Sequence, residues 1–121
     1  MSSLPDLDPV IHPAARLKVT ATLAGLRGGD RISFPRLQKL LDMTAGNLSV
    51  HLRKLEDAGY VGVRKTHVGR TPTTYVWLTP AGHRALEDYT AALRSLLDAS
   101  PAAAAAVAEG GRREPDALDS V

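Results

Sequence analysis

Cationic side chains are concentrated in the middle of this 121-residue chain. Residues 36–70 contain seven lysine or arginine residues against three aspartate or glutamate residues, although the formal net charge of the whole chain is only +2. A local excess of positive charge attracts a polyanion more strongly than the same charge spread over a surface. Residues 36–70 are therefore the first candidate for a binding surface, with a polyanion as the expected partner.

The residue types needed for catalysis or metal binding are absent or scattered. The chain has no cysteine, which excludes disulfides, thiolate nucleophiles and cysteine-ligated metals. Its four histidines are spread over separate predicted elements, which does not favour a metal site; they are His12, His51, His67 and His83. No paired carboxylates, nucleophile elbow, glycine-rich phosphate loop or HExxH motif is present. We expect neither an enzyme nor a bound cofactor or metal.

Hydrophobic periodicity and capping residues predict three helices in the first half of the chain. The first spans about residues 13–26. The second begins after a Ser33 cap and ends near Asp42, and the third begins after a Thr44 cap and ends at Gly59. The third helix carries apolar side chains at positions i, i+4 and i+7, namely Leu48, Leu52 and Leu55. The short joint between the second and third helices is typical of a helix-turn-helix.

The pattern then changes from helical to alternating, which predicts a β-hairpin followed by a last helix. The strands are residues 61–66 and 73–79, with a loop at 67–72 between them. One face of the second strand carries Thr74, Val76 and Leu78, and the other carries Tyr75 and Trp77. The last helix begins after a Thr79 cap and spans about residues 80–98.

The helix-turn-helix and the hairpin contain two distinctive segments, "LLDMTAGNLSVHLRKLEDAGYVGVRK" and "GRTPTTYVWLTPAG". These segments resemble the winged helix-turn-helix of small bacterial transcriptional regulators, the broad MarR and ArsR-like group. The resemblance covers about residues 13–98. It implies an α+β, mainly helical fold with three helices, a two-stranded wing and a long C-terminal dimerisation helix. It also implies a homodimer that binds double-stranded DNA, with the third helix in the major groove and the basic wing on the adjacent groove or backbone.

The first half of the third helix has the small and polar side chains that suit a groove about 12 Å wide. The candidate DNA contacts on this helix are Thr44, Ala45, Gly46, Asn47, Ser49, Val50, Arg53 and Lys54. Asn47 can pair with an adenine edge, and Val50 or Ala45 can touch a thymine methyl group. Arg53 and Lys54 can reach backbone phosphates.

Structural explanations remain open for several of these residues. Thr44 and Asn47 can act as helix caps, and Gly46 can permit close helix packing. The two cationic residues can be ordinary solvated charges. His51 lies near the leucine stripe, which favours a structural role over a phosphate contact.

The hairpin has a basic tip around Gly69. The candidate contacts here are Lys65, Arg70 and Thr71, and the family resemblance singles out Arg70 as a wing residue. A cationic tip can lie along a minor groove or a row of phosphates. The alternative is a hairpin that is charged only to protect its edge.

The last helix has an apolar seam at spacings of three and four residues. The seam consists of Leu86, Tyr89, Leu93 and Leu96. Because so short a chain has no further partner to offer, the seam predicts a homodimer. The alternative is that these side chains pack on the first helix of the same chain, and both arrangements can occur together.

The expected organisation is an N-terminal arm at 1–12, a DNA-binding and dimerisation domain at 13–98, and a disordered, alanine- and glycine-rich tail at 99–121. No secretory signal is evident, and no apolar stretch reaches the roughly 20 residues needed to cross a bilayer. We therefore expect no membrane association and a cytoplasmic location. Whether a small-molecule effector binds is left open by the sequence, although the lack of cysteine excludes a thiolate metal sensor of the ArsR type.

Together these features predict a sequence-specific regulator of transcription that binds double-stranded DNA, with repression as its expected action. The alternative is a winged helix that serves as a protein-interaction module and whose basic face is incidental.

Overall fold

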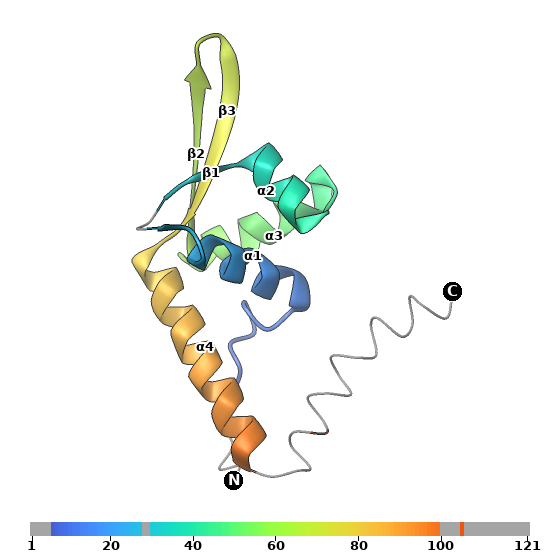
Figure 1. Ribbon diagram of the computed structural model, residues 1–121, viewed down its shortest axis with the longest axis vertical. Helices are drawn as coiled ribbons and strands as arrows, with labels where there is room; N and C mark the ends of the chain where they lie inside the picture. The colour runs from blue at the N-terminus through green and yellow to red at the C-terminus, as the bar shows by residue number, and fades with distance from the viewer. Residues whose placement is uncertain (1–5, 28–29, 100–104, 106–121) are drawn as a thin grey trace, which may run out of the picture.

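The β-hairpin projects from one end of the helical body, and the last helix extends from the other end (Figure 1). The computed structural model describes residues 6–27, 30–99 and 105. The elements in chain order are α1 (Ala14–Ala24), β1 (Ile32–Ser33), α2 (Phe34–Leu41), α3 (Ala45–Asp57), β2 (Val61–Val68), β3 (Thr71–Leu78) and α4 (Pro80–Ala99). This order confirms the mainly helical winged helix-turn-helix predicted from the sequence.

Short polar side chains cap both helices of the helix-turn-helix. At the start of α2, the Ser33 hydroxyl accepts the backbone N–H of Arg36 at 3.4 Å. At the start of α3, the Thr44 hydroxyl accepts the N–H of Asn47 at 3.1 Å. Each bond satisfies a donor that the first helical turn leaves free. Beyond α3, Gly59 has a φ of +81°, the left-handed conformation expected where this helix ends.

The sheet has one strand more than the sequence predicted. β1 pairs antiparallel with β3, and β3 pairs with β2, so the strand order is β1-β3-β2. Ile32 stands opposite Val76 and is buried. In the sequence Ile32 is an isolated β-branched residue. A strand of two residues has no alternating pattern, so hydrophobic periodicity could not predict β1.

The hairpin strands are longer than predicted and the loop between them is shorter. Val68 pairs with Thr71, so only Gly69 and Arg70 connect the strands, and the predicted loop at 67–72 is wrong. Gly69 has a φ of +64°, as the first position of a two-residue type II′ turn requires. The regular ladder therefore continues up to the basic tip.

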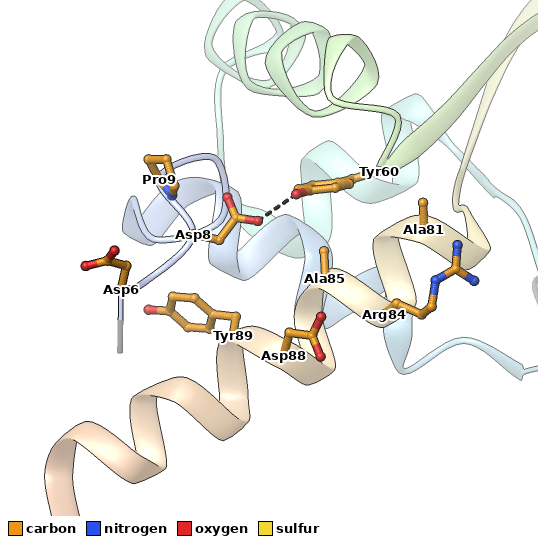
Figure 2. Close-up of a pocket in the computed structure, with 9 residues that line it drawn as sticks. All are labelled: Asp6, Asp8, Pro9, Tyr60, Ala81, Arg84, Ala85, Asp88 and Tyr89. Carbon is orange, nitrogen blue, oxygen red and sulfur yellow. Dashed lines mark hydrogen bonds between the residues drawn. The ribbon is translucent and has the colours of Figure 1, made fainter. Parts of the chain in front are cut away.

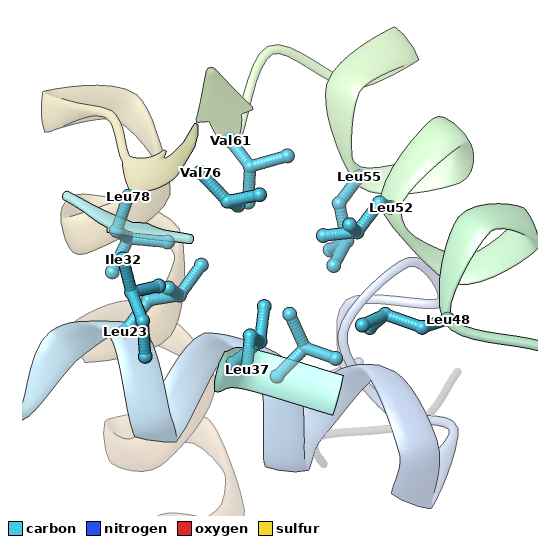
Figure 3. Packing of buried hydrophobic residues seen from close by; sticks show 10 residues of the cluster. Leu23, Ile32, Leu37, Leu48, Leu52, Leu55, Val61, Val76 and Leu78 are labelled. Carbon is cyan, nitrogen blue, oxygen red and sulfur yellow. The ribbon is translucent and has the colours of Figure 1, made fainter. Parts of the chain in front are cut away.

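The core lies between the three N-terminal helices and one face of the sheet (Figure 3). The leucine stripe of α3 is buried in it, with Leu48 and Leu55 0% exposed and Leu52 4% exposed. These leucines belong to one cluster with Val19, Leu23, Ile32, Leu37, Val61, Val76 and Leu78. Burying one such aliphatic side chain contributes about 1.5–3 kcal/mol. One face of α3 is thus held by the core, and the opposite face is left to solvent.

The described segment before α1 packs on the helical body. Ile11 is fully buried, and the Tyr60 hydroxyl donates to the Asp8 carboxylate at 2.6 Å. These contacts hold the described part of the expected N-terminal arm against the domain. Residues 1–5 of that arm, and all of the expected tail at 99–121 except 99 and 105, lie outside the described residues.

Candidate nucleic-acid interface

The exposed face of α3 lies opposite its buried leucines. Gly46, Val50 and Arg53 follow one another on this face at positions i, i+4 and i+7, and all three are exposed. Val50 is 55% exposed although it is a branched aliphatic residue. The other candidates within this helix are exposed too, namely Ala45, Asn47, Ser49 and Lys54. Because no long side chain precedes Arg53 on this face, the helix can approach another surface closely.

The amino-terminal end of α3 is open to the outside. A Cβ atom added to Gly46 would meet no heavy atom within 4 Å, which excludes close helix packing as the reason for this glycine. Thr44 does cap the helix, as its structural explanation required, and it is exposed. The first turn of a helix also presents free N–H groups and a positive dipole end, which favour an anion. This end of α3 therefore carries small side chains and can bind a phosphate at its free N–H groups.

A groove of about 480 Å³ lies between α3 and the inner face of the hairpin. It is lined by Phe34, Ser49, Val50, Leu52, Arg53, Glu56, Val63, Lys65 and Thr74. Arg53 from the helix and Lys65 from β2 bring two cations to opposite walls. Ser49 and Thr74 add a hydroxyl group to each of the same walls. The Glu56 carboxylate in the same lining offsets one of the two cations, and the remaining positive charge can attract phosphates between the helix and the hairpin.

The basic residues of the hairpin divide between its two faces and its tip. Alternation along β2 places Lys65 on the inner face with Val63, whereas Arg64 lies on the outer face. Arg70 and Thr71 are exposed at the tip. The structure therefore brings Lys65 together with α3, and it holds Arg70 and Thr71 at the far end of the hairpin.

Five residues of the groove were not among the sequence candidates for DNA contact: Phe34, Leu52, Glu56, Val63 and Thr74. Strand alternation had placed Thr74 correctly on the face of Val76, but it did not show that this face continues beyond the core toward α3. The side of α3 on which Glu56 lies depends on how the helix is rotated against the hairpin. That rotation is a tertiary property, so no local signal could have found Glu56.

The chain matches the family model described as a winged helix DNA-binding domain over residues 15–97. The chain belongs to this family. Uncharacterized protein MJ0432 of Methanocaldococcus jannaschii is 32% identical to it over 80 residues, which cover 66% of this chain and 84% of that protein.

Solved structures of transcriptional regulators are similar to this winged-helix domain. A transcriptional regulator homologue from Pyrococcus horikoshii OT3 has a TM-score of 0.67 and 31% identity, covering 74% of this chain and 86% of that one. A PadR family regulator from Eggerthella lenta DSM 2243 has a TM-score of 0.55 and 26% identity, covering 68% and 76%. A MarR family regulator and a possible regulator for arsenical resistance share the fold. The chain is thus a winged-helix protein of the transcription-regulator type and not an enzyme.

In this winged-helix domain, Tyr89 of the predicted α4 seam is already buried by contacts within the chain. Tyr89 is 4% exposed, and its hydroxyl lies 3.0 Å from Nδ1 of His12. Burial raises the pKa of Tyr89. The three leucines of the seam stay partly exposed, namely Leu86, Leu93 and Leu96. Packing against the segment before α1 therefore accounts for the burial of Tyr89. The three leucines remain accessible to a second copy of the chain.

A second hollow, of about 580 Å³, lies between the segment before α1 and α4 (Figure 2). Asp6, Asp8 and Asp88 line it together with Arg84 and the ring of Tyr60. The hydrogen bond to the Asp8 carboxylate, reinforced by burial, raises the pKa of Tyr60 to about 12. Because carboxylates predominate, this hollow repels phosphates and is not part of the candidate interface.

His51 supports α3 from the side of α1. The Arg16 guanidinium lies 3.5 Å from Nδ1 of His51 and also donates to the backbone carbonyls of Val10, at 2.6 Å, and Pro9, at 3.4 Å. Burial, followed by the charges of Arg16 and Lys54, lowers the pKa of His51. A neutral, partly buried imidazole next to an arginine suits a structural role better than a phosphate contact.

Within the described residues, no group of three or more histidine, cysteine, aspartate or glutamate side chains is arranged to hold a metal ion. The same part of the chain contains no helix with the length and apolar character needed to span a bilayer.

Proposed function

We propose that this winged-helix domain is a sequence-specific, double-stranded DNA-binding regulator that acts as a homodimeric repressor in the cytoplasm. The observation that carries the proposal is the groove between α3 and the hairpin, whose lining includes Arg53 from the helix and Lys65 from β2. Membership of a DNA-binding family and the likeness to transcriptional regulators support it. Repression follows from occupancy, because a dimer on promoter DNA excludes other proteins from the same grooves.

The exposed face of α3 fits a major groove, which is about 12 Å wide. With α3 in the major groove, the hairpin reaches the neighbouring minor groove, and the sugar–phosphate strand between the two grooves lies along the α3–hairpin groove. Arg53 and Lys65 then neutralise phosphates of that strand, and Ser49 and Thr74 donate hydrogen bonds to it. Arg70, at the tip, contacts the backbone further along.

The homodimer rests on α4. Leu86, Leu93 and Leu96 are partly exposed and form an apolar stripe that a second copy of the chain can cover. A two-fold axis through this interface presents two α3 helices to one side of a duplex. The expected binding site is therefore nearly palindromic, with half-sites about one helical turn apart.

Selection of bound duplexes from a random pool tests the proposal, because it reports DNA binding and half-site spacing together. The log affinity for the selected duplex should fall with log salt, with a slope of roughly 0.9 per phosphate contact. Lys65→Ala and Arg70→Ala should each flatten the slope by about one unit. Arg84→Ala is the matched control, since Arg84 lies in the carboxylate-lined hollow, and it should leave the slope unchanged.

Two outcomes would count against the proposal. If no duplex binds above the non-specific level in low salt, the domain is better explained as a protein-interaction module. If Lys65→Ala and Arg70→Ala leave the salt slope as it is, neither the hairpin wall of the groove nor the hairpin tip contacts phosphates through these residues.

A further inference from the structure

We infer that Val50 is a specificity-determining residue that recognises the 5-methyl group of a thymine in the major groove. This inference rests on the proposed DNA-binding function and names the base feature that the domain reads. Val50 is 55% exposed on the outward face of α3, midway between Gly46 and Arg53. It is thus the apolar centre of the face that enters the groove.

The chemistry of a valine side chain restricts what Val50 can recognise. Isopropyl groups neither donate nor accept hydrogen bonds. Val50 therefore contributes favourable binding free energy only where it covers apolar surface. In the major groove the thymine methyl group is the apolar group on the base edges, whereas the other bases present donors and acceptors. A polar base edge covered by Val50 loses its hydrogen bonds to water and gains none from the valine. Binding at such a base is therefore disfavoured.

The surroundings of Val50 allow a base to come close. One turn earlier, Gly46 has open space in place of a side chain, so nothing on that side holds the duplex away. On the other side, Val50 lines the groove that also contains Arg53 and Lys65. Phosphates held by these two cations fix the position of the strand, and Val50 then meets a base edge in a defined register.

Thymine-to-deoxyuridine exchange in the selected duplex provides the test, because it removes only the methyl group. Each thymine of a half-site is exchanged singly, and the affinity is measured at fixed salt. We expect a loss of about fourfold at one position, the effect of exposing about one buried methyl group. At that position the Val50→Ala variant should bind the thymine and deoxyuridine duplexes equally.

Leu40→Ala is the matched control variant. Leu40 is also an exposed aliphatic residue, at 60%, but it lies on α2 and outside the groove between α3 and the hairpin. This variant should keep the fourfold sensitivity to the methyl group. Because Val50 is exposed, Val50→Ala should retain the folded structure, which circular dichroism verifies.

Each result decides between the alternatives. If the wild type binds every deoxyuridine duplex as well as the thymine duplex, or if Val50→Ala keeps the sensitivity, Val50 is only a solvent-exposed valine and the inference is wrong. The proposed function survives both of these results as long as the selected duplex still binds with its salt slope. If no duplex is selected at all, the proposed function and the inference fail together.

Discussion

The Tyr60 hydroxyl donates a 2.6 Å hydrogen bond to the carboxylate of Asp8, which lies 52 residues earlier in the chain. Tyr60 directly follows the turn that ends α3, and the segment containing Asp8 also places His12 against Tyr89 of α4. The bond therefore links the end of α3 to α4 through the segment before α1. This link can be weakened without altering the exposed face of α3.

Tyr60→Phe should lower the free energy of unfolding by about 1 kcal/mol at pH 7, because the Asp8 carboxylate loses a donor. The pKa of Tyr60 is raised from 10.0 to about 12 in the folded chain, so folding favours the protonated phenol. This stabilisation is complete below pH 10 and is lost as the pH rises toward 12. Urea unfolding at pH 7 and pH 11 should show the difference between wild type and variant shrinking at the higher pH.

The control for this prediction is the same substitution in an Asp8→Asn background. With the carboxylate already removed, Tyr60→Phe should have less effect than in the wild type. Equal effects in the two backgrounds, or a wild-type difference that does not change with pH, would contradict the role given to this bond.

Gly82→Ala should destabilise the fold by about 1–3 kcal/mol, although alanine is the better helix former. A Cβ atom on Gly82 would overlap the backbone carbonyl oxygen of Tyr60, so α4 would have to move away from the start of β2. Gly46→Ala is the matched control. It should leave the free energy of unfolding unchanged or raise it by up to about 1 kcal/mol. Urea denaturation followed by the fluorescence of Trp77 measures both variants, and equal stabilities would show that the close approach at Gly82 is not required.

Gly46→Ala should weaken binding of the selected duplex even though the fold is preserved. The added methyl group would occupy the space through which the end of α3 approaches the DNA, at a cost of about 1–3 kcal/mol, comparable to overpacking in a core. Titration at fixed salt measures the loss, and the salt slope should stay unchanged because no charge is altered. An unaltered affinity would mean that this end of α3 does not lie close to the duplex.

Leu93→Asp should convert the proposed dimer into a folded monomer. Leu93 lies outside the cluster that forms the core, so a charge there should disrupt the surface between two copies more than the fold. Sedimentation measures the mass, and circular dichroism verifies the helices. Glu87→Ala, an exposed change on the same helix, should leave the mass unchanged. A variant that still sediments as a folded dimer would show that α4 is not the interface.

Much of the fold could be predicted from local patterns. The Thr44 cap, the three leucines of α3 and the left-handed Gly59 all follow from interactions within a few residues, and the structure confirms them. β1 could not be predicted, because Ile32 becomes part of a strand only through pairing with Val76, a residue far along the chain. The candidate site was predicted in part: its residue types were evident, but their distribution between two walls and a tip was not.

By itself, the sequence determined which segments form helices and strands and which face of each is apolar, because caps, turns and periodicity act over short distances. Only the tertiary structure decided that Arg53 and Lys65 share one groove and that Gly46 faces open space. It also decided that Tyr89 is already buried inside the chain. These relationships depend on the angles at which α3, α4 and the hairpin pack, and those angles arise when residues distant in sequence bury a common core.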